Sequence, residues 1–279
     1  MALLDVNGAR LWVEDSGGGG EPIVFAHGLL WSGAMYAPQV AALRARYRCV
    51  TFDFRGQGHS PVCADGYDMD TLFSDAAALI EQLDLGAVHF VGLSMGGFVG
   101  QRLAARRPEL VRSLALLETA ADPEPAFNHF KYRVMLELSR VVGLRPFVGL
   151  VMKAMFGAPF LRDPARAAER AGLQDQLLAI DRVGLRRATM GVLTRKAIAA
   201  ELARIRAPTL VLSGEADAAV VPARSRKMAD AIPGARFQLI PRAGHTSTLE
   251  EPAAVTAALD AFLAGLPARQ QGIRKAPPS

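Results

Sequence analysis

The stretch VHFVGLSMGG, residues 88–97, decides the fold of this chain. Its nearly continuous apolar run over 88–93 predicts a buried strand, and the residues after it predict a helix over 95–106. Between the two, Gly92, Ser94 and Gly96 form the pattern G-x-S-x-G. This pattern between a strand and a helix is typical of a sharp, strained turn that exposes a nucleophilic serine. Ser94 is therefore the candidate nucleophile, and a glycine-rich packing turn is the alternative.

The same alternation of strand, turn and helix extends on both sides of this stretch. Short apolar runs predict strands over 23–26, 49–54, 113–117, 209–213 and 237–240, and helical patterns cover 72–83, 223–232 and 253–263. Strands that alternate with helices predict an α/β fold whose mostly parallel, doubly wound sheet is covered on both faces. Near the N-terminus, two runs flank Asn7-Gly8, a pair that tolerates a tight turn and predicts a β-hairpin.

The alternation is interrupted once, between residues 118 and 207. This segment is helical in character, and a structureless loop of that length is improbable inside a compact domain. We therefore predict an inserted helical cap of about four helices over 121–206, on an α/β core formed by 1–120 and 207–265. Residues 121–200 contain 13 Lys and Arg against 7 Asp and Glu, which we expect mainly on the solvated face of the cap. A flexible basic tail is expected over 266–279.

Composition excludes several classes of protein. The 279 residues are 51% hydrophobic and 21% charged, which is globular composition and argues against a disordered or fibrous chain. Two cysteines exclude a disulfide scaffold and a cysteine-rich zinc site. The net charge is +5, but no Lys/Arg cluster with interleaved aromatic residues is present, so we expect no nucleic-acid partner.

The sequence also bears on the cellular location and oligomeric state of the protein. No stretch of about 20 apolar residues is present, so we expect no membrane span. The first 15 residues lack the basic and apolar regions of a signal peptide, which makes a cytoplasmic location the expectation. The oligomeric state is left open, a homo-oligomer included.

A serine hydroxyl needs a base, and the base needs an acid that orients it. His245, which follows the last predicted strand, is the candidate base, because the other histidines lie in turns, at a strand start or in the insertion. Asp217 follows strand 209–213 and is the candidate acid. Glu118, at the end of strand 113–117, is its main rival, and Glu215 and Asp122 are further alternatives.

Two backbone N–H groups are candidates for holding a developing oxyanion. Met95 directly follows the serine at the start of a helix, and Leu29 follows the His27-Gly28 turn after strand 23–26. Downstream, Ser247-x-x-Glu250 has the spacing of a capping box ahead of the C-terminal helix.

These elements together resemble the serine-nucleophile branch of the α/β-hydrolase superfamily. The likeness rests on His27-Gly28, the stretch DFRGQGHS at 53–60, the G-x-S-x-G turn, Asp217 and Gly244-His245, and it spans residues 23–263. It implies the α/β-hydrolase fold, because the order Ser, Asp, His is the order of the triad in that family. It also implies no cofactor and no metal. Within 53–60, it implies a structural role in supporting the oxyanion turn for Asp53, Arg55, Gly56, Gly58 and Ser60.

The resemblance implies a serine hydrolase of the esterase or lactonase type, acting on a small ester or lactone with an apolar part. A carbon–carbon bond hydrolase acting on a vinylogous diketone is an alternative, with Arg140, Arg145 or Arg162 of the cap binding a carboxylate. Further alternatives are a cofactor-free perhydrolase, a lyase and a non-catalytic ligand receptor. Because position 94 is serine, the aspartate-dependent haloalkane dehalogenases and epoxide hydrolases are rejected.

Overall fold

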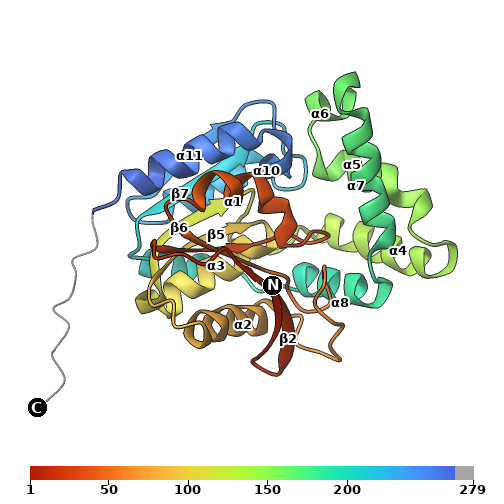
Figure 1. Cartoon of the computed structure of the whole chain (residues 1–279). Coiled ribbons are helices and arrows are strands. Elements are labelled where there is room, and N and C mark those ends of the chain that lie inside the picture. The colour runs from red at the N-terminus through yellow and green to blue at the C-terminus, as the bar shows by residue number, and fades with distance from the viewer. Residues whose placement is uncertain (268–279) are drawn as a thin grey trace, which may run out of the picture.

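The computed structural model describes residues 1–267, and an eight-stranded sheet forms the centre of this part of the chain (Figure 1). The strand order is β1-β2-β4-β3-β5-β6-β7-β8. β1 and β2 form the predicted hairpin and pair antiparallel, as do β2 and β4, and every other pairing is parallel. The mostly parallel sheet predicted from the sequence is thereby confirmed. The strands are β1 (Ala2–Val6), β2 (Ala9–Asp15), β3 (Pro22–Ala26), β4 (Arg48–Phe52), β5 (Val88–Leu93), β6 (Val111–Leu117), β7 (Thr209–Gly214) and β8 (Arg236–Ile240).

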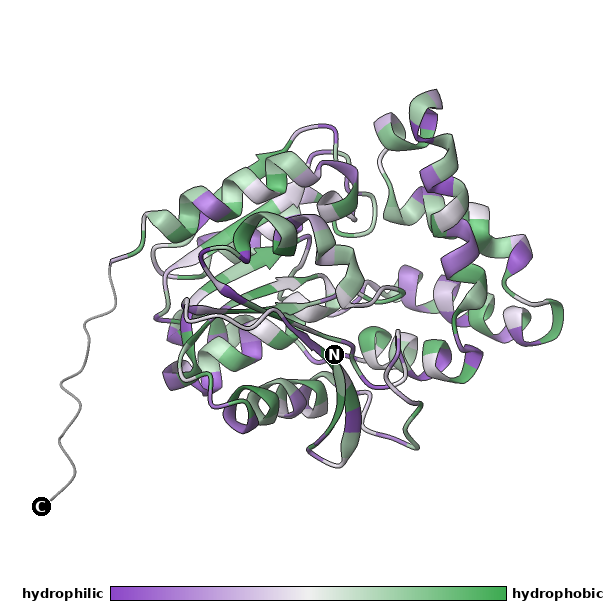
Figure 2. Ribbon diagram, viewed as in Figure 1, coloured by the Kyte–Doolittle hydropathy of each residue, from purple (hydrophilic) through white to green (hydrophobic). Residues whose placement is uncertain are grey.

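Helices cover both faces of the sheet, because its central strands are apolar on both sides. In β3, Val24 and Ala26 join one buried cluster while Ile23 and Phe25 join the other. The apolar colour of the central strands in Figure 2 follows from this. One face is covered by α2 (Met69–Gln82), α3 (Met95–Arg106) and α9 (Pro222–Asp230), and the other by α1 (Ala37–Leu43) and α11 (Pro252–Ala264).

The structure differs from the sequence-based expectation in element boundaries and in one additional helix. β4 ends at Phe52 instead of residue 54, because its partner β3 ends at Ala26, which is paired with Phe52. Helix α1 was not expected. It is seven residues long with proline in its first turn, and it packs against α11, a contact between segments more than 200 residues apart.

Between β6 and β7 the chain forms helices that lie beside the sheet, drawn in green and teal in Figure 1. The segment 121–206, which lies wholly within the described range, contains five α-helices instead of about four. The prolines there begin helices as well as interrupt them, since Pro159 lies in the first turn of α6. The five are α4 (Ala126–Val142), α5 (Val148–Met155), α6 (Ala158–Arg162), α7 (Ala167–Ala179) and α8 (Arg182–Leu193). Of the expected tail, residues 268–279 lie outside the described residues.

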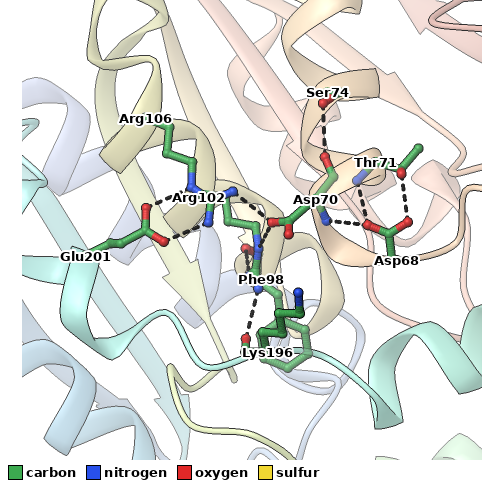
Figure 3. A network of polar contacts seen from close by, with 9 residues as sticks. All are labelled: Asp68, Asp70, Thr71, Ser74, Phe98, Arg102, Arg106, Lys196 and Glu201. Carbon is green, nitrogen blue, oxygen red and sulfur yellow. Dashed lines mark hydrogen bonds and ion pairs between the residues drawn. The ribbon is translucent and has the colours of Figure 1, made fainter.

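Helix α3 is anchored at the far end from Ser94 by a polar network (Figure 3). The buried Arg102 guanidinium donates to Asp70 of α2 and to the carbonyls of Phe98 and Lys196. Arg106 bridges Asp70 and Glu201 with distances of 2.7–2.8 Å. These bonds tie α2, α3 and the turn at 199–204 together, and so fix the helix whose first turn follows Ser94.

Candidate active site

Ser94 lies in a strained turn between β5 and α3. Its φ and ψ angles are +50° and −107°, a conformation that L-residues rarely adopt. The flanking glycines are required by close backbone approach. A Cβ on Gly92 would lie 2.3 Å from the Gly96 carbonyl oxygen, and a Cβ on Gly96 would lie 2.0 Å from the Ala26 carbonyl oxygen. The G-x-S-x-G pattern is therefore the sequence that this turn demands.

The structure brings Ser94, His245 and Asp217 into one hydrogen-bonded chain. His245 Nε2 lies 2.9 Å from Ser94 Oγ, and His245 Nδ1 lies 2.8 Å from Asp217 Oδ2. The three residues come from the ends of β5, β8 and β7, all of which meet at the carboxyl edge of the sheet. Each side chain is largely buried.

The hydrogen bonds of Asp217 define the state of the imidazole. Asp217 Oδ1 accepts the N–H groups of Ala219 and Val220, so Oδ2 is left for His245. An ionised carboxylate only accepts hydrogen bonds, so the proton of a neutral His245 lies on Nδ1. Nε2 is then an acceptor facing the Ser94 hydroxyl. The arrangement can take a proton from the serine as its oxygen attacks a substrate.

The turn after β3 lies against the serine turn. The Gly96 N–H donates to the His27 carbonyl, and a Cβ on Gly28 would lie 2.9 Å from the Leu93 side chain. This places the backbone at Leu29 beside that of Met95. Met95 is the first residue of α3, so its N–H has no acceptor within the helix.

His27 holds this turn as a neutral residue. It is fully buried, and burial lowers the pKa of its imidazole. The Phe54 N–H donates to Nε2 at 2.9 Å, so Nδ1 carries the proton and donates to the Gly28 carbonyl at 2.7 Å. The histidine thus connects the turn after β3 to the loop after β4, and its role here is structural.

The loop after β4 contains the residues to which the family resemblance assigns a role in supporting the oxyanion turn. Asp53 accepts the N–H groups of Gly33 and His59 through its two oxygens. Ser60 donates to the Asp53 carbonyl, and Arg55 forms a buried bidentate ion pair with Asp75. Two further members of this group, Gly56 and Gly58, have positive φ angles. None of these side chains lines the cavity above Ser94.

A cavity of about 150 Å³ opens above Ser94 and His245. Its walls come from both the sheet edge and the helices of 121–206, and they are almost entirely apolar. Two charged side chains line it, namely Glu124, which pairs with Arg195, and Lys131. Arg140, Arg145 and Arg162 are not among the lining residues, and Arg140 instead pairs with Glu137 on the exposed face of α4.

Glu250 is a positioning residue whose role sequence reasoning missed. The expected capping box is wrong, since the short helix α10 (Ser247–Glu250) begins without a side-chain cap. The carboxylate of Glu250 accepts three backbone N–H groups, those of Gly157, Gly244 and Thr246. Gly244 and Thr246 flank His245, and Gly157 precedes α6. One buried carboxylate therefore fixes the histidine loop and joins it to the helical segment.

Glu118, the rival acid, does not reach His245 and lies fully buried beside Asp217. Burial, followed by the nearby charge of Asp217, raises the pKa of Glu118 well above its usual value. This environment favours the protonated form of the Glu118 carboxyl group.

This raised pKa predicts a pH-dependent stability difference between the wild type and Glu118→Gln. Above about pH 4.5, the folded protein keeps a proton that the unfolded chain releases, so the free energy of unfolding falls as pH rises toward the folded-state pKa. The glutamine cannot titrate. Urea unfolding across this pH window should show the wild type losing up to about 1.4 kcal/mol per pH unit relative to the variant. A difference that does not change with pH would contradict the buried, protonated state.

Two further features concern the whole described range. Within residues 1–267, no helix has both the length and the apolar character needed to cross a bilayer. In that same range, no three His, Cys, Asp or Glu side chains are grouped as ligands for a metal ion.

Known hydrolases resemble this chain in sequence and in fold. The model of the alpha/beta hydrolase family matches residues 23–259. A Mycobacterium tuberculosis protein, provisionally named a non-heme bromoperoxidase, is 33% identical over 258 residues, which cover 91% of this chain and 98% of that one.

Solved structures with a similar fold include an esterase and an enol-lactonase. A thermophilic esterase from Thermogutta terrifontis is 29% identical, with a TM-score of 0.84 over 92% of this chain and 93% of its own. The enol-lactonase from Burkholderia xenovorans LB400 is 31% identical, with a TM-score of 0.85 over 94% of this chain and 100% of its own.

Proposed function

The chain belongs to the alpha/beta hydrolase family, and from this premise we propose that it is a serine hydrolase that cleaves a carboxylic ester or lactone with an apolar part. The observation that carries the proposal is the hydrogen-bonded chain from Ser94 through His245 to Asp217. In the same proposal, residues 1–120 and 207–265 are the catalytic core and 121–206 is a cap that encloses the substrate.

In the first half of the reaction, Ser94 Oγ attacks the substrate carbonyl carbon while His245 Nε2 takes the hydroxyl proton. The carbonyl oxygen becomes an oxyanion, which the N–H groups of Leu29 and Met95 stabilise. Asp217 keeps the imidazole oriented and stabilises the imidazolium. The C–O bond then breaks, and the imidazolium gives its proton to the leaving alkoxide. The product of this half is an acyl-enzyme on Ser94 and a free alcohol.

In the second half, water replaces the alcohol. His245 takes a proton from water as the water oxygen attacks the acyl carbon, and it returns the proton to Ser94 Oγ when the acid leaves. For a lactone the leaving hydroxyl stays attached to the acyl group, so one hydroxy acid is released.

The cavity supports an apolar substrate. Its walls are aliphatic and aromatic. Among the lining residues of the described chain the one lysine or arginine is Lys131, an exposed side chain whose ammonium lies over the Tyr132 ring. The three arginines considered for carboxylate binding lie away from the lining, which argues against the carbon–carbon hydrolase. Perhydrolysis is a second candidate, supported by the bromoperoxidase name of the Mycobacterium relative. In it, hydrogen peroxide would take the place of water and release a peracid.

A panel of p-nitrophenyl esters, lactones and vinylogous diketones, together with a fluorophosphonate label, tests the proposal. We expect ester or lactone turnover, no diketone cleavage, and a stoichiometric covalent adduct on Ser94 located by peptide mass spectrometry. A peroxide-dependent peracid signal would select the second candidate. A protein that binds an apolar ester without turnover or labelling would be a receptor, and the proposal would be wrong.

A further inference from the structure

The outward face of α4 carries a stripe of apolar side chains. Six of the thirteen exposed large hydrophobic side chains in residues 1–267 lie on this helix. Five of them recur at intervals of three or four residues and so share one face of the helix. Their exposed fractions run from 41% to 85%, and they are Phe127, Phe130, Val134, Leu138 and Val141. Aligned exposure of this kind marks an interaction surface.

The opposite face of α4 lines the cavity above Ser94. On this face, Tyr132, Met135, Leu136 and Ser139 line the cavity. The helix therefore has two apolar faces, one toward the cavity and one toward solvent. Packing of the helical segment accounts for the first face only, which leaves the stripe without a partner within the described part of the chain.

Positive charge surrounds the stripe. Arg182 of α8 lies at the C-terminal end of α4, with its guanidinium 3.4 Å from where a Cβ on Gly143 would lie. Glu137 is the one acidic residue of α4, and it is already paired with Arg140 and Arg186. The cations on and beside the helix are Lys131, Arg133, Arg140, Arg145, Arg182 and Arg186.

We propose that the outer face of α4 docks on an anionic lipid surface. Phenylalanine, leucine and valine side chains flanked by lysine and arginine are the chemistry of a helix that lies in a membrane interface, its apolar face among the acyl chains and its cations at the headgroups. The contact is peripheral, since none of the described helices is long and apolar enough to span a bilayer.

Charge favours a lipid surface over a second copy of the chain. Residues 121–200 carry 13 Lys and Arg against 7 Asp and Glu, so two such segments would repel each other. An anionic lipid surface can take the apolar stripe among its acyl chains and bind the surrounding cations through its headgroups.

Vesicle flotation tests this inference. The full chain should float with phosphatidylcholine vesicles that contain phosphatidylglycerol, but not with pure phosphatidylcholine. Binding should weaken as salt rises to about 0.5 M, because the headgroup attraction is screened. The double variant Phe130→Ser, Val141→Ser should bind at least about tenfold less, since two inserted side chains are lost. A matched control, Val62→Ser with Leu239→Ser, removes exposed apolar residues elsewhere and should bind like the wild type.

A charge variant, Arg133→Glu, gives an independent measurement that does not alter the stripe, and it should also reduce flotation. Failure of the wild type to bind the anionic vesicles, or equal binding by the stripe variant, would overturn the inference. So would a dimer in light scattering that Phe130→Ser, Val141→Ser dissociates, because a second copy would then cover the stripe. Binding needs no turnover, so Ser94→Ala should float like the wild type, and a failed hydrolase proposal would leave this result unchanged.

Discussion

Replacing Ser94 with alanine should reduce turnover of an accepted ester by about 10⁵-fold and abolish fluorophosphonate labelling. The variant loses the attacking oxygen but keeps the Cβ, so the strained turn at φ +50° is no worse for alanine than for serine. His245 keeps its bond to Asp217. The effect should therefore appear in kcat, with an unfolding free energy within about 1 kcal/mol of the wild type. Stopped assays at high enzyme concentration together with urea unfolding measure both quantities.

Ser139→Ala is the matched control. Ser139 also lines the cavity, but its hydroxyl donates to the Leu136 carbonyl within α4. Its removal should leave turnover within about tenfold of the wild type, as expected away from the chemistry. If Ser94→Ala kept activity within tenfold while Ser139→Ala lost it, the nucleophile would be misassigned.

Much of the fold could be predicted because its signals are local. The Asn7-Gly8 turn needs two positive φ angles, and the structure has +47° and +76° there. The buried strands need apolar side chains on both faces, and the turn at Ser94 needs glycines at 92 and 96. Each of these requirements is met by residues within a few positions, so each can be recognised in the sequence itself.

The choice of acid could not be made from local signals. Asp217 and Glu118 both follow parallel strands, so both reach the same edge of the sheet. The two acids differ in how the chain continues after each strand, and only Asp217 is brought to His245. The loop after β7 turns the Ala219 and Val220 N–H groups toward Asp217, whereas Glu118 has a φ of +45° and is buried behind it.

The roles of Glu250 and Gln39 could not be predicted because their hydrogen-bond partners are distant in the sequence. The S-x-x-E spacing around Glu250 has a local explanation in a capping box, but its carboxylate reaches Gly157, 93 positions away in sequence. Gln39 is fully buried and donates to the Thr248 carbonyl, 209 positions away. Buried polar side chains are satisfied by whatever backbone the fold brings to them. Such partners cannot be found without the three-dimensional arrangement.

Asp217→Asn should reduce turnover by about 10⁴-fold through the state of the histidine. The Ala219 and Val220 N–H groups need an acceptor, so they hold the amide oxygen of the asparagine in the place of Oδ1. The amide nitrogen then faces His245 Nδ1 and donates to it. That bond forces the imidazole proton onto Nε2, which faces Ser94 Oγ and can no longer accept its proton. The loss should appear in kcat and equally in the rate of fluorophosphonate labelling.

Glu118→Gln is the control that separates the two acids. Burial beside Asp217 favours the protonated form of Glu118, which a neutral amide matches in charge and nearly in shape. Its turnover at neutral pH should stay within about tenfold of the wild type. The opposite pattern, with Asp217→Asn active and Glu118→Gln inactive while both variants fold, would transfer the orienting role to Glu118. The two substitutions carry the same change of atoms, but only Asp217 contacts His245 Nδ1, so the large loss is expected at that position.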